Sequence, residues 1–195
     1  MQDALEEMIA AAGAAYAAHV SDPGGQASIA RIFAALAVPP EPRAATPARR
    51  PATGYFAQAA DPANFRDRAL SRLAAALIRL EPSFTWRARG GGGTNASENY
   101  PDGHANAMIV GPGGLAQVDH VLLGLSLLAP HVRYPDHDHT PEETYLVLSD
   151  GEFSQDGVTW FTPGPGGTFY NPPGTLHAMR SGAAPLLAMW ALWRD

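Results

Sequence analysis

The segment that decides the fold reads Tyr134-Pro135-Asp136-His137-Asp138-His139-Thr140-Pro141-Glu142-Glu143-Thr144-Tyr145. His137 and His139 are two residues apart, and positions i and i+2 of an extended strand project from the same face. Glu143 and Tyr145 should share a face of the next strand for the same reason. The spacing therefore predicts that two imidazoles can hold one metal ion and that a carboxylate and a phenol lie together nearby.

A second segment, Asn171–His177, carries a further imidazole on a proline- and glycine-rich turn. His137, His139, Glu143 and His177 together offer three nitrogens and one carboxylate, which suits iron, zinc, manganese, cobalt or nickel. The chain has no cysteine, so thiolate metal sites and disulfides are excluded. We expect the remaining histidines to be surface or hydrogen-bonded residues: His19, His104, His120 and His131.

The region around these segments is composed of short apolar runs separated by turn residues. Such spacing is typical of an antiparallel sandwich or barrel. Asp156-Gly157 and the Gly111–Gly114 run have the chemistry of tight turns. The predicted strands cover 108–110, 121–128, 145–148, 158–161, 167–170 and 186–193.

The first part of the chain is rich in alanine and has apolar residues at helical spacing, and Asp61-Pro62 is a good helix start. Glycines between Arg89 and Thr94 predict a loop before the strands. The expected organisation is one integrated domain, with a helical extension and lid or loop region at 1–104 and a β-barrel at 105–195. The predicted helices are Asp3–His19, Ser28–Ala37 and Asp61–Leu80.

Composition narrows the choice of partners. Of the 195 residues, 46% are hydrophobic and 16% charged, and the formal net charge is −6, so a globular, acidic protein is expected. Scattered basic residues give no footprint for nucleic acid or an anionic membrane. The first residues lack the pattern of a secretory signal, and no run is long enough to span a membrane. We expect a cytoplasmic monomer or homodimer that acts on a small molecule.

Two motifs carry a family resemblance. The pattern His-x-His-x3-Glu-x7-Gly over His137–Gly151 resembles the first cupin motif, and Gly166-x5-Pro-x-Gly-x2-His177 resembles the second. The short intermotif segment is typical of small bacterial cupins. His131 stands where the first motif has a glycine, and Ser181 stands where the second has an asparagine. The resemblance implies a mainly β, jelly-roll-like double-stranded β-helix barrel with an N-terminal helical extension.

The stretch Tyr134–Tyr145 on a chain of this length resembles, more closely, the cupin dimethylsulfoniopropionate (DMSP) lyases of the DddQ type. This resemblance implies cleavage of the zwitterion DMSP to dimethyl sulfide and acrylate by β-elimination. A divalent ion bound to the substrate carboxylate would acidify the adjacent C–H bond. Tyr145 would then be the general base, because a phenol beside a cation has a lowered pKa. Tyr134 is the second candidate, as base or as a wall of the pocket.

A sulfonium has no hydrogen-bond donors, so aromatic side chains are expected to hold it. The N-terminal helices and the Gly90–Gly93 loop could cover the barrel mouth as a lid. The candidate substrate-binding aromatics are Trp160, Tyr170, Trp190 and Trp193.

Other functions are compatible with the same ligands. An iron-dependent dioxygenase or a non-catalytic metabolite-binding cupin would use the same four residues. A metal-bound Tyr145 would crowd the positions a dioxygenase needs. From Pro101 onward the basic residues are Arg133, Arg180 and Arg194, too few for a phosphosugar isomerase.

Overall fold

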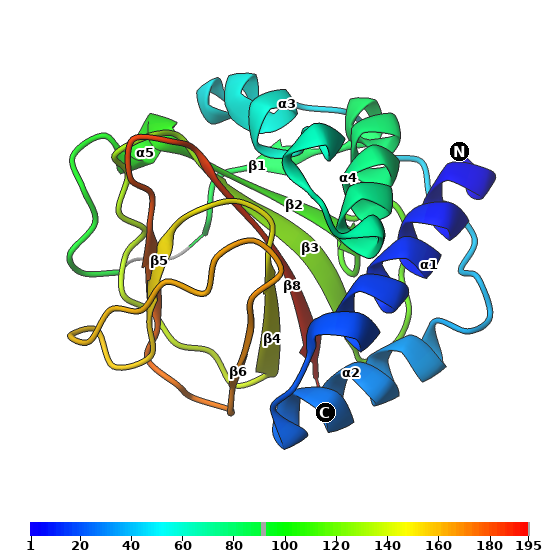
Figure 1. The fold of residues 1–195 in the computed structure, drawn as a ribbon. Helices are drawn as coiled ribbons and strands as arrows, with labels where there is room; N and C mark the ends of the chain where they lie inside the picture. The colour runs from blue at the N-terminus through cyan, green and yellow to red at the C-terminus, as the bar shows by residue number, and fades with distance from the viewer. Residues whose placement is uncertain (91–92, 195) are drawn as a thin grey trace.

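The computed structural model describes residues 1–90 and 93–194. Helices dominate the first half of the chain and strands the second (Figure 1). The helical elements are α1 (Gln2–His19), α2 (Pro23–Ala35), η1 (Pro51–Tyr55), α3 (Phe56–Ala59), η2 (Pro62–Asn64), α4 (Arg68–Leu80), η3 (Glu81–Ser83) and α5 (Tyr100–Gly103). The strands are β1 (Trp86–Arg87), β2 (His104–Val110), β3 (Val121–Leu128), β4 (Glu142–Val147), β5 (Glu152–Ser154), β6 (Thr168–Asn171), β7 (Ala178–Arg180) and β8 (Leu186–Trp193).

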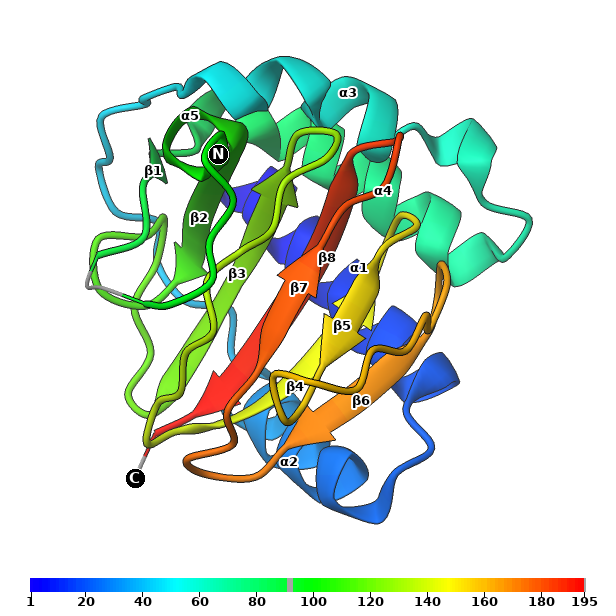
Figure 2. The same ribbon diagram turned by 90° about the vertical axis from the view of Figure 1, so that its left-hand side faces the viewer.

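The strands form a barrel from two facing layers. One layer is an antiparallel sheet in the order β1-β2-β3-β8-β4-β6, and the other is built around the β5-β7 pair, which lies across it in Figure 2. Isolated bridges extend the smaller layer: Arg133 pairs with Arg180, His137 with His177, and Phe153 with Phe161. The His137–His177 bridge brings the two histidine-bearing segments side by side.

Alternation along β4 separates an inner from an outer face of the large sheet. Leu146 belongs to the core cluster shared with the helices, whereas Tyr145 and Val147 belong to the cluster inside the barrel. Glu143 and Tyr145 line one cavity, as their spacing predicts.

The N-terminal helices cover the outer face. Leu5, Met8 and Leu77 share a core with Leu123 and Met189, so α1 and α4 form a third layer behind the sheet (Figures 1 and 2). The prediction that these helices form a lid is therefore wrong, because their apolar stripes are buried on the face away from the histidines. Gly91 and Gly92 of the predicted loop lid lie outside the described residues. None of the described helices is both long and apolar enough to cross a membrane.

Tyr16 connects α1 to the sheet through hydrogen bonds, and its replacement should change the stability of the protein. Its buried hydroxyl donates to the carbonyls of Thr144 and Met189, at 3.1 and 3.2 Å. Tyr16→Phe should lower the free energy of unfolding by about 1 kcal/mol, the usual net value of a buried hydrogen bond. For a domain of this size that corresponds to a melting temperature about 2–4 °C lower. Thermal denaturation followed by circular dichroism checks this, and an unchanged melting temperature would contradict it.

Three expected elements differ from the structure. The helix expected over Ser28–Ala37 is α2, which begins earlier, at Pro23, because Asp22 caps it and accepts from the Gly25 amide at 2.9 Å. The helix expected over Asp61–Leu80 is split: Asp61 caps only the short turn η2, and α4 begins after Asp67, whose side chain accepts from the Leu70 amide at 2.9 Å. The extended backbone of Phe65 lies between them. The strand expected over 158–161 is reduced to the single Phe161 bridge, because Asp156 accepts hydrogen bonds from the amides of Val158 and Thr159 and curls the chain into a turn.

The two departures from the cupin motifs lie close together in the fold. His131 adopts a left-handed backbone, φ 59°, at the position where the motif has glycine. The Ser181 hydroxyl accepts from the Val132 amide at 2.9 Å and donates to the Ala129 carbonyl at 2.6 Å. The serine thus ties both sides of the turn that His131 strains, and the turn keeps its shape without the usual residues.

Candidate metal centre

Three of the four predicted ligands converge in the structure. Glu143 lies on β4, His139 three residues before that strand, and His177 just before β7. One ligand atom from each lies within 4.8 Å of the others. Glu143 Oε2 is 3.4 Å from His139 Nε2 and 3.2 Å from His177 Nε2. These distances leave the three groups facing a common point.

The histidines are oriented by the main chain. Nδ1 of His137, His139 and His177 lies 2.8–2.9 Å from a carbonyl oxygen two residues away along the chain. A carbonyl can only accept, so Nδ1 carries the proton and Nε2 keeps the lone pair. Each imidazole can therefore offer its Nε2 lone pair to a metal ion, which is the arrangement expected of metal-ligating histidines.

His137 is placed beside this group of three. Its ring centroid is 4.1 Å from that of His177 and 6.2 Å from that of His139. Burial and the neighbouring His177 lower the pKa of His137 to about 3, so it is neutral. The segment before β4 is not a continuous strand, and this explains why His137 and His139 do not share a face as strictly as their spacing predicts.

The site is suited to a divalent cation. Burial acts to raise the pKa of Glu143, but the neighbouring imidazoles of His139 and His177 outweigh it and lower that pKa to about 2. His177 Nε2 is buried and has no hydrogen-bond partner among the described residues. A buried carboxylate beside an orphaned imidazole nitrogen fits a metal ion, because nitrogen and oxygen donors of this kind bind first-row transition metals.

Both predicted tyrosines lie at the site. Burial, then the Glu143 carboxylate, raises the pKa of Tyr145 well above its ordinary value. Burial likewise raises the pKa of Tyr134, whose hydroxyl accepts from Asn106 Nδ2 at 2.7 Å. The Tyr134 ring lies 5.2 Å from that of His137. In the chain alone, both phenols are therefore protonated at neutral pH.

These groups face a cavity of about 290 Å³ inside the barrel. Its predicted lining residues are Tyr134, His137, His139, Glu143, Tyr145 and Trp190. Residues that the sequence analysis did not identify also line it: Arg89, Asn106, Met108, Ser126 and Asp138. Asn106 and Ser126 could have been predicted from the sequence, because they are polar residues in otherwise apolar strands. They pair with each other in the β2-β3 register.

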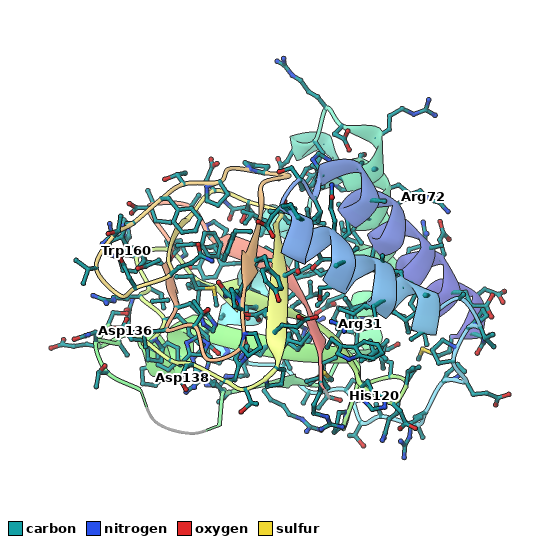
Figure 3. The ribbon with its side chains drawn as sticks, turned by 90° about the horizontal axis from the view of Figure 1, so that it is seen from below. Arg31, Arg72, His120, Asp136, Asp138 and Trp160 are labelled. Carbon is teal, nitrogen blue, oxygen red and sulfur yellow. The ribbon has the colours of Figure 1, made fainter. Side chains whose placement is uncertain are left out.

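Of the four candidate aromatics, the structure brings Trp190 into the cavity. Tyr170 lies on the outer face, where its hydroxyl donates to Glu142 at 2.7 Å, and Trp193 packs against Arg31 of α2. Trp160 stacks with Arg180, 4.1 Å from ring to guanidinium, at the edge of the molecule away from α4 (Figure 3). Trp160, Tyr170 and Trp193 are therefore removed from the set of substrate-binding candidates.

Trp190 owes its position to Gly124 on the neighbouring strand. A Cβ on Gly124 would lie 2.3 Å from the indole Cη2 and 2.4 Å from the Ala107 carbonyl oxygen. The indole Nε1 donates to Ser126 at 3.1 Å, which fixes the ring flat against the sheet. Trp190 thus forms the floor of the cavity.

Gly124→Ala is expected to lower the free energy of unfolding by about 1–3 kcal/mol, the usual cost of overpacking, because the indole and the backbone cannot both give way. Thermal denaturation measures the loss. Gly54→Ala is the matched control, since a Cβ there meets nothing within 4 Å. Equal melting temperatures for the two variants would show that the Gly124 contact is unimportant.

Comparisons with known proteins show which family the chain belongs to. The family model described as dimethylsulfoniopropionate lyase matches residues 24–188. The chain is 30% identical to dimethylsulfoniopropionate lyase DddQ of Ruegeria pomeroyi over 103 residues, 52% of this chain and 51% of that protein. It is 28% identical to a putative lyase, DddL of Cereibacter sphaeroides, over 148 residues, 74% of this chain and 60% of that one. The chain thus spans about half to three-fifths of the length of these curated relatives.

Solved structures match over the whole fold. The crystal structure of DddQ from Ruegeria pomeroyi superposes with a TM-score of 0.78 at 24% identity, covering 100% of this chain and 93% of that one. A chain from the crystal structures of the DMSP lyases RdDddP and RnDddQII gives 0.76 at 20% identity, covering 99% and 93%. These likenesses confirm the predicted fold, a cupin barrel with N-terminal helices. With the family model matching most of its length, the chain belongs to the dimethylsulfoniopropionate lyase family.

Proposed function

We propose that this protein is a metal-dependent carbon–sulfur lyase that splits DMSP into dimethyl sulfide and acrylate, with Tyr145 as the general base. The observation that carries the proposal is the inner face of β4, where Glu143 and Tyr145 face one cavity together with His139. Family membership supports the substrate.

The proposed reaction is a β-elimination. Tyr145 removes a proton from the carbon next to the carboxylate, the C–H electron pair becomes the new C=C bond, and the C–S pair leaves with dimethyl sulfide. A divalent ion such as iron, zinc or manganese, held by His139, Glu143 and His177, would supply a Lewis acid for the substrate carboxylate. Because burial raises the pKa of Tyr145, its ionisation needs a cation among these ligands.

The remaining cavity residues fit supporting roles. Trp190 offers an aromatic surface to the sulfonium, which cannot donate hydrogen bonds. Tyr134 is the second candidate for proton transfer; its ring lies near His137 and its hydroxyl is fixed by Asn106. His137 lies beside the three converging ligands, and it or Tyr145 would be available to hold the same ion as a fourth ligand.

Headspace gas chromatography of purified protein incubated with DMSP tests the proposal. We expect dimethyl sulfide that disappears with a chelator and returns when iron, manganese, zinc or cobalt is added back. Release that survives exhaustive chelation would reject the metal-dependent mechanism. No release with any of the four metals would instead favour a non-catalytic, metabolite-binding cupin.

A further inference from the structure

Arg89 brings a permanent positive charge to the cavity, and the elimination described above does not use it. The residue follows β1, is half-buried, and lines the same cavity as Glu143 and Trp190. We propose that Arg89 recognises the carboxylate of the substrate, and that His104 is the positioning residue that holds Arg89 in place. The inference rests on the proposed function in taking this cavity as the substrate site.

His104 fixes the backbone of Arg89. The amide N–H of Arg89 donates to His104 Nε2 at 3.0 Å, and His104 Nδ1 lies 2.6 Å from the carbonyl oxygen of Tyr100. Since one ring nitrogen accepts and the other must donate, His104 is a neutral imidazole with both nitrogens used by the main chain. Its ring is 2% exposed and stacks on Tyr100, with centroids 3.8 Å apart and planes 6° from parallel. The hydrogen bond to His104 thus ties Arg89, two residues after β1, to the first residue of β2.

The charge of Arg89 acts on the histidine side of the cavity. It is among the influences that lower the pKa of His137, after burial and the neighbouring His177. The same charge acts to lower the pKa of Tyr134, whereas burial raises that pKa. Arg89 lines the same cavity as both of these side chains.

The charges of the other cavity residues explain why a carboxylate would bind at Arg89. Glu143 and Asp138 are carboxylates, and both tyrosines and His137 are neutral, so before a metal ion binds, Arg89 is the one permanently cationic side chain in the described lining. A guanidinium binds a carboxylate through two parallel hydrogen bonds, which fixes its direction as well as its distance. Trp190 lies on the sheet floor and suits the cationic end. A carboxylate at Arg89 and a cationic group against Trp190 can therefore be held by side chains of the same cavity.

Binding of a non-reacting pair of ligands tests the role of Arg89. Acrylate and acrylamide have nearly the same shape but differ in charge, and isothermal titration calorimetry on the chelator-treated chain compares their binding without turnover. We expect the chain to bind acrylate about tenfold more tightly than acrylamide, as a charge-assisted hydrogen bond provides. Arg89→Gln should remove the preference, and Arg89→Lys should keep part of it.

Arg87 supplies the matched control. It has the same side chain two residues earlier, but it is exposed and packs over Gly113, outside the cavity. Arg87→Gln should keep the full preference for acrylate. A preference unchanged in Arg89→Gln, or absent from the unsubstituted chain, overturns the proposal.

His104→Phe tests the positioning role. Phenylalanine keeps an aromatic face against Tyr100 but removes both hydrogen bonds, so the preference for acrylate should fall as in Arg89→Gln. The double variant should be no worse than either single one, because both act on one interaction. His104→Gln, which can accept and donate, should recover part of the preference. Additive losses, or full preference in a folded His104→Phe, overturn the positioning role.

Steady-state kinetics on the metal-loaded protein separates the two proposals. Arg89→Gln should raise KM for DMSP by about tenfold and change kcat less, since the guanidinium binds the substrate before and during reaction. If no dimethyl sulfide forms at all but acrylate binding still depends on Arg89, the lyase assignment fails and the carboxylate site stands. If dimethyl sulfide forms with KM unchanged in Arg89→Gln, the lyase stands and Arg89 has no role in recognition.

Discussion

Tyr145→Phe is expected to reduce dimethyl sulfide release by about 10²–10⁴-fold, the range that general-base catalysis contributes. The substitution removes one oxygen from a buried ring and leaves its packing against Phe169, 4.9 Å away, in place. The fold and most of the metal content should therefore survive while proton removal fails. Headspace gas chromatography gives the rate, and elemental analysis gives the metal content.

Tyr170→Phe is the control for this experiment. Tyr170 lies on the neighbouring strand β6, and its hydroxyl donates to Glu142 on the outer face of the sheet. Its loss should leave release unchanged. If Tyr145→Phe keeps more than a tenth of the activity, the base is another group, and Tyr134→Phe becomes the decisive variant.

Glu143→Gln should abolish both metal binding and turnover. Glu143 is 3% exposed and supplies the one carboxylate in the three-residue cluster of the described chain, and glutamine keeps its shape but not its charge. We expect the metal affinity to fall by more than the roughly 10–100-fold that replacing an outer partner of a metal ligand costs. Elemental analysis after dialysis, with the chromatographic assay, checks this.

Glu142→Gln provides the comparison for that variant. The two glutamates are adjacent in sequence, but Glu142 projects to the other side of the strand, where it pairs with Arg31 and accepts from Tyr170. Its substitution should leave metal content and turnover as they were. Normal metal content in Glu143→Gln would show that the ion is held elsewhere.

The sequence predicted the centre of the site because a strand fixes where alternate side chains point. The two-residue step from Glu143 to Tyr145 falls within β4, and both line the cavity. The step from His137 to His139 falls in a segment without continuous strand pairing, so the alternation argument did not predict that His137 lies beside the three converging ligands. The burial and hydrogen bonds that shift the pKa values depend on distant segments and could not be predicted from spacing.

The aromatic residues show where composition fails. A tryptophan or tyrosine suits either face of a strand, so abundance alone cannot place it in a pocket. The pairing register of the strands does place these residues. Tyr170 pairs with Thr144, which faces outward, and Trp193 is an odd number of residues from Trp190, so both lie on the outer face. Arg89 and His104 could not be found in this way, because the contact between them joins a loop to the start of a strand.

The side chains of Glu142 and Glu143 lie on opposite faces of β4, and this restricts how the strand can change in length during evolution. Deleting or inserting one residue between Glu143 and Tyr145 would turn one of the two away from the cavity, because neighbouring residues of a strand point to opposite faces. In an alignment of distant relatives, a gap of one residue between positions 143 and 145 should therefore mark either a misalignment or a chain that has lost this centre.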